Sequence, residues 1–195
     1  MRAAPFADLI TVGKDGLDAT PLPLMLDPAD GPQGSLIGHI ARANPQWRTT
    51  DVAQEVLAIF SGPDSYISPS YYETKRLSGK VVPTWNYVTI HVRGRISFFH
   101  EPEALLELVR RLTEQHEGGR AAPWAVSDAP PDFIQSQLRG IVGLRVEITA
   151  LTGKWKMSQN RSPADRAGVV AGLRADGGPK AEAVAAAVAE AMERS

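Results

Sequence analysis

Apolar and polar residues alternate in short runs along the first hundred positions of the chain, with turn residues between the runs. A run at 6–12 is closed by a Gly-Lys-Asp-Gly turn at 13–16, and a second run follows at 19–26. A tight turn between two apolar runs predicts a β-hairpin. Because Pro21 and Pro23 cannot donate to a strand ladder, we expect the second strand to lie at a sheet edge or to be bulged.

The same pattern predicts further strands, at 35–40, 54–60, 66–69, 81–99 and 143–151. A Ser-Gly-Pro-Asp sequence at 61–64 is expected to end one of them. In the longest, residues 88–93 alternate with period two, which indicates one buried and one wetted face. Gly94 then predicts a bulge or bend in that strand.

After residue 100 the apolar period changes from two to that of a helix. Leu105, Leu108, Val109 and Leu112 recur at helical spacing. Helices are predicted at 101–117, 132–139, 163–173 and 179–194. Strands do not alternate with helices, which disfavours a parallel nucleotide-binding sheet. Short strands with Gly and Pro corners instead favour a mainly β protein built on a small antiparallel barrel.

Composition narrows the possible functions. A chain of 195 residues favours one domain, or one domain with a helical appendage. It has no cysteine, which excludes thiolate catalysis and cysteine metal sites, and a net charge of -1, which disfavours nucleic-acid binding through a general positive field. With no apolar run approaching the roughly 18 residues that span a bilayer, we expect a soluble, cytoplasmic protein with no membrane contact.

Motifs for common chemistries are missing from the sequence. No two histidines have metal-ligand spacing, so no metal is expected. The sequence has no P-loop, no GxGxxG and no GxSxG nucleophile elbow. Any redox chemistry would therefore need a bound cofactor.

The segment at 154–161 departs furthest from an ordinary core pattern. It combines cations, an indole and small polar groups in the residues Lys154, Trp155, Lys156, Ser158, Gln159, Asn160 and Arg161. Ser162 and Pro163 follow as a predicted N-cap and first helical residue. Cations and amides beside an aromatic ring suit a ligand with a phosphate and a flat ring. The alternative is a solvated loop that happens to contain lysines.

Three other groups are candidates for the same ligand. Residues 66–72 place tyrosines and serines, among them Ser68 and Tyr71, near Lys75, although they could equally form a tyrosine-rich barrel rim. Residues 84–87 put Trp85 on one strand face and Asn86 on the other, and the aromatic residues there could simply be core. His39 ends a strand near polar residues, where a satisfied structural histidine is the alternative.

Four stretches together resemble a known family: 38–47, 66–72 with Lys75, 82–87 with His91 and Gly94, and 151–161 with the following 165–173. They are similar to the PaiB-type FMN-binding negative transcriptional regulators. That family belongs to the FMN-binding split-barrel superfamily, which also contains pyridoxamine phosphate oxidases and flavin reductases. The resemblance covers nearly the whole chain.

The resemblance implies a six-stranded antiparallel split β-barrel with Greek-key character, peripheral helices and a C-terminal helix pair. It further implies a homodimer with FMN at the subunit interface. We expect residues 1–160 to form the FMN-binding split-barrel domain. Residues 161–195 would be a C-terminal helical extension packed on the barrel.

The resemblance also assigns expected roles. Contacts to the flavin or its phosphate are expected from Lys154, Lys156, Ser158, Gln159 and Asn160. Arg161 and Lys75 would add phosphate charge, and Trp85 and Asn86 would line the ring pocket. Ser68, Tyr71 and His39 complete the candidate set, and no catalytic residue is assigned.

Direct DNA binding is not expected despite the regulator name. In the last predicted helix, Lys180 and Arg194 are outnumbered by three glutamates, and most other positions are Ala or Val. A recognition helix needs cations or amides aimed at phosphates and base edges. Two alternatives stay open: an FMN-dependent oxidoreductase similar to pyridoxamine phosphate oxidase or flavin reductase, and a non-catalytic interaction dimer with a degenerate pocket.

Overall fold

The computed structural model describes residues 1–194. Within them it has seven strands: β1 (Phe6–Gly13), β2 (Gly16–Pro23), β3 (Met25–Asp27), β4 (Ser35–Ala41), β5 (Glu55–Ile67), β6 (Thr84–Phe99) and β7 (Ile141–Lys156). The helices are α1 (Gln46–Thr49), α2 (Glu73–Ser78), α3 (Pro102–Glu117), α4 (Pro131–Leu138), α5 (Pro163–Asp176) and α6 (Pro179–Glu193), with short 3-10 turns η1 (Pro69–Tyr71) and η2 (Val126–Asp128). The mainly β class is confirmed, but the six-strand prediction is wrong.

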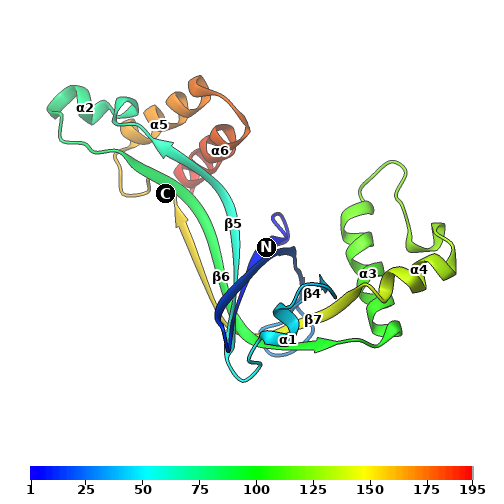
Figure 1. Cartoon of the computed structure of the whole chain (residues 1–195). Coiled ribbons are helices and arrows are strands. Elements are labelled where there is room, and N and C mark those ends of the chain that lie inside the picture. The colour runs from blue at the N-terminus through cyan, green and yellow to red at the C-terminus, as the bar shows by residue number, and fades with distance from the viewer. Residues whose placement is uncertain (195) are drawn as a thin grey trace. The chain divides into compact units, whose positions relative to one another are not determined.

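The chain divides into two compact units whose sequences interleave. Unit 1 comprises residues 1–60 and 90–152, and unit 2 comprises residues 61–89 and the chain from 153 onward. Each of the long strands β5, β6 and β7 contributes residues to both units (Figure 1). We describe each unit separately. The division at residue 160 into a barrel domain and a helical extension stays a prediction.

The sheet has the order β2-β1-β5-β6-β7-β4-β3. The predicted hairpin is confirmed, because β1 and β2 pair antiparallel with Gly13 opposite Gly16, and β2 is an edge strand as its prolines require. In unit 1 the sheet curls back on itself. A Cβ on Gly38 of β4 would lie 2.8 Å from the Pro23 carbonyl oxygen at the end of β2, so only glycine fits there.

Aliphatic side chains fill the inside of this curl. The buried cluster includes Leu9, Leu36, Val92, Val142 and Leu144. α3 covers the other face of β4, where Leu108 and Leu112 pack on Met25 and Ile37. The helical period predicted for 101–117 is thus confirmed as the pattern of a helix with one buried face.

The strand end predicted at 61–64 is wrong. Residues 61–64 do not end β5, which runs on to Ile67. The pairing of β5 with β1 ends at Phe60, so Pro63 lies beyond it and no hydrogen bond to β1 is lost there. Val88 of β6 packs closely on Gly62, where a Cβ would lie only 2.9 Å from the Val88 side chain. Gly94 lies within β6, close against the Glu147 backbone of β7, and the bulge or bend expected there stays a prediction.

Unit 2 has a separate, smaller core. It joins Ile67, Tyr72 and Met157 to apolar residues of α5 and α6, which pack side by side (Figure 1). The predicted start of α5 is confirmed, since the Ser162 hydroxyl accepts a hydrogen bond from the Asp165 backbone N–H at 3.1 Å and Pro163 follows the cap. None of the helices in the described part of the chain is long and apolar enough to cross a bilayer.

Candidate cofactor site

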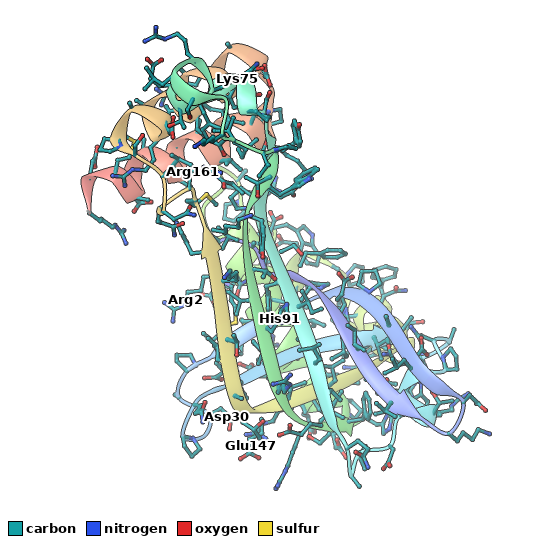
Figure 2. All side chains as sticks on the ribbon, turned by 90° about the vertical axis from the view of Figure 1, so that its left-hand side faces the viewer. Arg2, Asp30, Lys75, His91, Glu147 and Arg161 are labelled. Carbon is teal, nitrogen blue, oxygen red and sulfur yellow. The ribbon has the colours of Figure 1, made fainter. Side chains whose placement is uncertain are left out.

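Unit 2 carries eleven of the twelve predicted site residues, and His39 alone belongs to unit 1. Figure 2 labels two of the eleven, Lys75 on α2 and Arg161 in the segment between β7 and α5. The eleven residues of unit 2 come from three separate parts of the chain: the end of β5 with α2, the start of β6, and the end of β7 with its following turn. The last strand was predicted to end at residue 151, but β7 extends through Lys156, so Lys154–Lys156 lie on the strand and not after it.

Asn86 and Ser158 form a buried polar pair. Asn86 is fully buried, its Nδ2 donates to the Ser158 Oγ at 3.0 Å, and the Ser158 hydroxyl lies 3.2 Å from Asn86 Oδ1. Ser158 is the one non-glycine residue of 1–194 with positive φ, at 60°. A side chain in the left-handed region costs energy and persists where surrounding contacts fix it, which the bonds to Asn86 do here.

Lys156 contacts Thr84, which lies two residues before Asn86 on β6. Its Nζ donates to Thr84 Oγ1 at 2.6 Å and lies 6.0 Å from the centre of the Tyr87 ring. The predicted alternation in β6 is confirmed: Asn86 points inward while Trp85 is 53% exposed. For Trp85 the core interpretation is therefore wrong, and its indole is open to a ligand or partner.

A hollow of about 460 Å³ lies beside α2 and α5. It is lined by Ser70, Tyr71, Tyr72, Glu73, Lys75, Arg76, Ala164 and Gly168. Lys75 Nζ donates to Ser70 Oγ at 3.0 Å, and the Ser68 hydroxyl accepts from the Ser70 backbone N–H at 3.1 Å. Arg76 is ion-paired with Glu73, so Lys75 supplies the unneutralised positive charge of this wall.

Two tyrosines border the hollow with different surroundings. The Tyr71 hydroxyl donates to Asp176, and burial together with that carboxylate raises the pKa of Tyr71 to about 12, so it stays protonated. The Arg161 guanidinium lies 4.6 Å from the centre of the Tyr72 ring. Tyr72 is 3% exposed, and its buried hydroxyl has no hydrogen-bond partner within residues 1–194. A buried hydroxyl without a partner is rare in native proteins, so this one needs an explanation.

Sequence reasoning missed Asp165, which holds this wall together. Its carboxylate accepts from the Thr74 backbone N–H and from Thr74 Oγ1, both at 2.8 Å. Burial alone would raise the pKa of Asp165, but the hydrogen bonds from Thr74 and Ser162 and the charge of Arg161 outweigh it and hold the pKa below its usual value. Asp165 thereby fixes the start of α2, and with it Lys75, to α5.

Some predicted residues are not brought into this arrangement. Gln159 folds back on its own segment, with Oε1 accepting from the Met157 N–H at 2.8 Å and Nε2 donating to the Trp155 carbonyl at 2.7 Å. Lys154 and Asn160 are exposed, and their side chains form no hydrogen bond or ion pair in the described part of the chain. The prediction that amides here read a ligand edge stays untested for these residues.

His39 lies opposite Gly143 in the β4–β7 ladder of unit 1. Its Nδ1 is buried without a partner in residues 1–194, which departs from the satisfied strand-end histidine considered above. Burial lowers the pKa of His39, so the ring is neutral at pH 7.

The residues of unit 2 fit a phosphate attached to a flat ring. Lys75, Arg161 and the Ser70 hydroxyl are donors suited to a phosphate, and the unpaired Tyr72 hydroxyl could complete its hydrogen bonds. The hollow lies within the roughly 300–1,000 Å³ typical of small-molecule sites. Exposed Trp85 and Tyr66, whose ring centres are 6.1 Å apart, offer aromatic surface in the same unit.

A curled antiparallel sheet with these features has counterparts among solved flavoprotein structures. The "FAD and Heme binding protein from Mycobacterium smegmatis" aligns with a TM-score of 0.54 and 15% identity over 80% of this chain and 67% of that protein. The "Flavocytochrome Anf3 from Azotobacter vinelandii" aligns with a TM-score of 0.53 and 13% identity over 80% of this chain, which spans only 63% of that one. Similarity at this level shows the shared fold.

The sequence comparison identifies the family. Residues 1–150 match the family described as "Putative FMN-binding domain", and the chain belongs to that family, whose cofactor is FMN. The match ends just before Lys154. A relative, "Protease synthase and sporulation protein PAI 2" from Bacillus subtilis, is 33% identical over 97% of this chain and 88% of its own length, so similarity to that protein extends through unit 2.

Proposed function

We propose that the chain forms a split-barrel homodimer that binds FMN at the subunit interface, and that unit 2 provides the phosphate end of the site. Lys75, Arg161 and Ser70 hold the phosphate, and the Tyr72 hydroxyl donates to it. The observation that carries this proposal is the hollow of about 460 Å³ with one unneutralised lysine on its wall and an unpaired buried hydroxyl on the Tyr72 that lines it.

The other predicted residues take supporting roles in this proposal. Lys156 adds positive charge from β7, and the Asn86–Ser158 pair fixes the backbone from which Lys156 and Arg161 extend. Trp85 packs on the flavin ring, and Lys154, Gln159 and Asn160 line the rim. Ser68 and Tyr71 position the hollow through Ser70 and Asp176. Bound FMN would supply hydride and one-electron chemistry, which the side chains of the protein lack.

The biological role that we propose is negative regulation of transcription of the PaiB type, exerted without direct DNA contact. In α6 the cations are already engaged: Lys180 pairs with Asp64 at 3.0 Å, and Arg194 pairs with Glu190. A helix whose cations are neutralised within the chain has little to offer phosphates. Regulation would then depend on a partner protein or on the flavin state.

The test of the phosphate assignment compares FMN with riboflavin, which lacks the phosphate. We expect Lys75→Ala to weaken FMN binding roughly ten- to hundredfold, the range for one charge-assisted hydrogen bond, and to leave riboflavin binding unchanged. Flavin fluorescence titration measures both affinities. Lys80→Ala is the matched control, since Lys80 is an exposed lysine of the same unit outside the hollow. Equal FMN affinity in Lys75→Ala and the wild type would refute the placement.

Four further measurements separate the functions. Sedimentation should give a dimer, and a monomer that binds FMN normally would refute the interface location. DNA affinity should not fall steeply with salt concentration, because a steep fall is the sign of contacts to DNA phosphates.

Bleaching of the bound flavin by NADPH with recovery in air would favour an FMN-dependent oxidoreductase instead. A folded protein that takes up no flavin would favour the non-catalytic interaction dimer.

A further inference from the structure

A second site lies in unit 1, along the outer side of α3. Figure 1 shows α3 and α4 as neighbours joined by the segment that contains η2. Two hollows of about 400 and 270 Å³ open beside α3, and both are walled by Arg110, Val126 and Ser127. The two hollows share these three residues, and we call them together the α3 groove.

Arg110 is the unusual residue of the α3 groove. Nearby arginines are engaged: Arg111 pairs with Asp27 at 2.7 Å, and Arg120 pairs with Glu117 at 3.0 Å. Arg110 is exposed and forms no ion pair within residues 1–194. A guanidinium beside apolar walls is a strong anchor for a carboxylate, because its fork of donors matches two oxygens at once.

The smaller hollow is the better place for a negatively charged ligand. Its lining is Leu106, Arg110, Val126, Ser127, Ala129, Pro131, Ile134 and Gln135, which includes no acidic residue. The larger hollow is lined in addition by Glu114 and Glu117. Glu117 is occupied by Arg120 and by the Trp124 backbone N–H at 3.2 Å, which ties the following segment to α3.

We propose that the α3 groove binds a small organic carboxylate with an apolar body of one or two rings. The carboxylate pairs with Arg110, and Ser127 and Gln135 donate the remaining hydrogen bonds. The apolar body lies against Leu106, Val126 and Ile134 in the smaller hollow. A volume of about 270 Å³ is slightly below the roughly 300–1,000 Å³ of typical small-molecule sites, which limits the ligand to this size. This site is independent of the flavin proposal.

Calorimetric titration with 1-naphthaleneacetate tests the charge and the fit together. The full-length chain is used with excess FMN, so that a flavin site is closed to the probe. The neutral amide 1-naphthaleneacetamide has nearly the same shape and serves as the matched ligand. We expect the acid to bind roughly ten- to hundredfold more tightly than the amide, and Arg110→Gln to abolish that preference. Arg93→Gln, at an exposed arginine on β6 of the same unit, should change nothing.

A second variant locates the ring. Ile134→Trp fills the smaller hollow and should block the acid while leaving the fold intact, as circular dichroism would verify. The proposal is overturned if acid and amide bind equally, if neither binds at millimolar concentration, or if Arg110→Gln retains the preference. It is also overturned if Arg110→Gln changes the oligomeric state in sedimentation, because the groove would then be covered by a second copy of the chain.

Discussion

The two units bury polar side chains in contrasting ways. In unit 1 the Gln46 amide donates to the Leu9 carbonyl at 3.2 Å and to Thr11 Oγ1 at 3.1 Å, both in the neighbouring strand β1. In unit 2 the buried Asn86 has its partner in Ser158, 72 residues further along the chain. The first arrangement fastens a short helix to a hairpin, whereas the second joins β6 to the turn that follows its neighbouring strand β7.

This difference explains why unit 2 is the better candidate for the flavin phosphate. The core of unit 1 is aliphatic and closes on itself, and the Gln46 Nε2 donates within it, although His39 Nδ1 and Gln46 Oε1 are buried there without a partner in residues 1–194. Unit 2 has a small core, and beside it Lys75 lines a hollow, while Arg161 stacks on the Tyr72 ring and the Tyr72 hydroxyl is buried without a partner in residues 1–194. What sets unit 2 apart is the hollow with an unneutralised lysine on its wall, which suits an anionic ligand.

Among the substitutions considered, Asp165→Ala in unit 2 should lower the free energy of unfolding most. The carboxylate is 2% exposed and binds both the backbone and the hydroxyl of Thr74. At roughly 1.5–3 kcal/mol for each hydrogen bond to a charged group, we expect Asp165→Ala to lower the free energy of unfolding by about 3 kcal/mol or more. Urea denaturation measures this. Glu182→Gln, at an exposed ion pair in the same unit, should cost less than about 1 kcal/mol.

The same variant also tests whether Asp165 holds Lys75 in place for the proposed flavin site, through its bonds to Thr74. Asp165 fixes the start of α2, so any folded Asp165→Ala protein should lose FMN affinity although the residue does not line the hollow. Loss of less than about 1 kcal/mol of stability, with FMN affinity unchanged, would contradict the view that unit 2 depends on long-range polar contacts.

Features that the sequence pattern predicted correctly are local ones. The β1–β2 hairpin, the Ser162 cap and the two faces of β6 each depend on residues within a few positions of one another. The grouping of Lys75 with Ser68 and Tyr71 is of the same kind, since these residues are close in the sequence. Local preference and periodicity contain this information without any knowledge of the fold.

What the pattern could not provide is pairing at long range. Asp165 and Thr74 are 91 residues apart, and no property of either residue predicts the other. Tyr72 was considered as part of a tyrosine cluster, but its unpaired hydroxyl is visible only once burial is known. The turn predicted at 61–64 failed for the same reason, because whether Pro63 breaks a strand depends on where the neighbouring strand β1 stops.

Ser158 offers a prediction of intermediate size that separates backbone strain from side-chain bonding. Ser158→Ala removes the partner of the buried Asn86 and should cost about 1–3 kcal/mol of unfolding free energy. Ser158→Gly removes the same hydroxyl but relieves the positive φ of 60°, so it should be less destabilising than Ala by about 1 kcal/mol. Thermal unfolding of both variants measures the difference. Equal stability of the two would mean that the left-handed backbone is not strained.

The smallest effect is expected at Asp30, a partly exposed acid of unit 1 labelled in Figure 2. Hydrogen bonds from Arg145, at 2.8 Å to Oδ1, and from Ser35 lower the pKa of Asp30 from 3.8 to about 2. Because the folded pKa is depressed, the stabilisation is present above the unfolded value and is lost as pH falls from about 4 toward 2. Asp30→Asn should therefore flatten the fall in stability over that interval, lowering stability slightly at pH 7, where the stabilisation is present, and having no effect near pH 2, where it has been lost. Urea midpoints from pH 7 to 2 measure it, and an unchanged acid slope would place the acid sensitivity of the protein elsewhere, with buried Asp165 of unit 2 the next group to substitute.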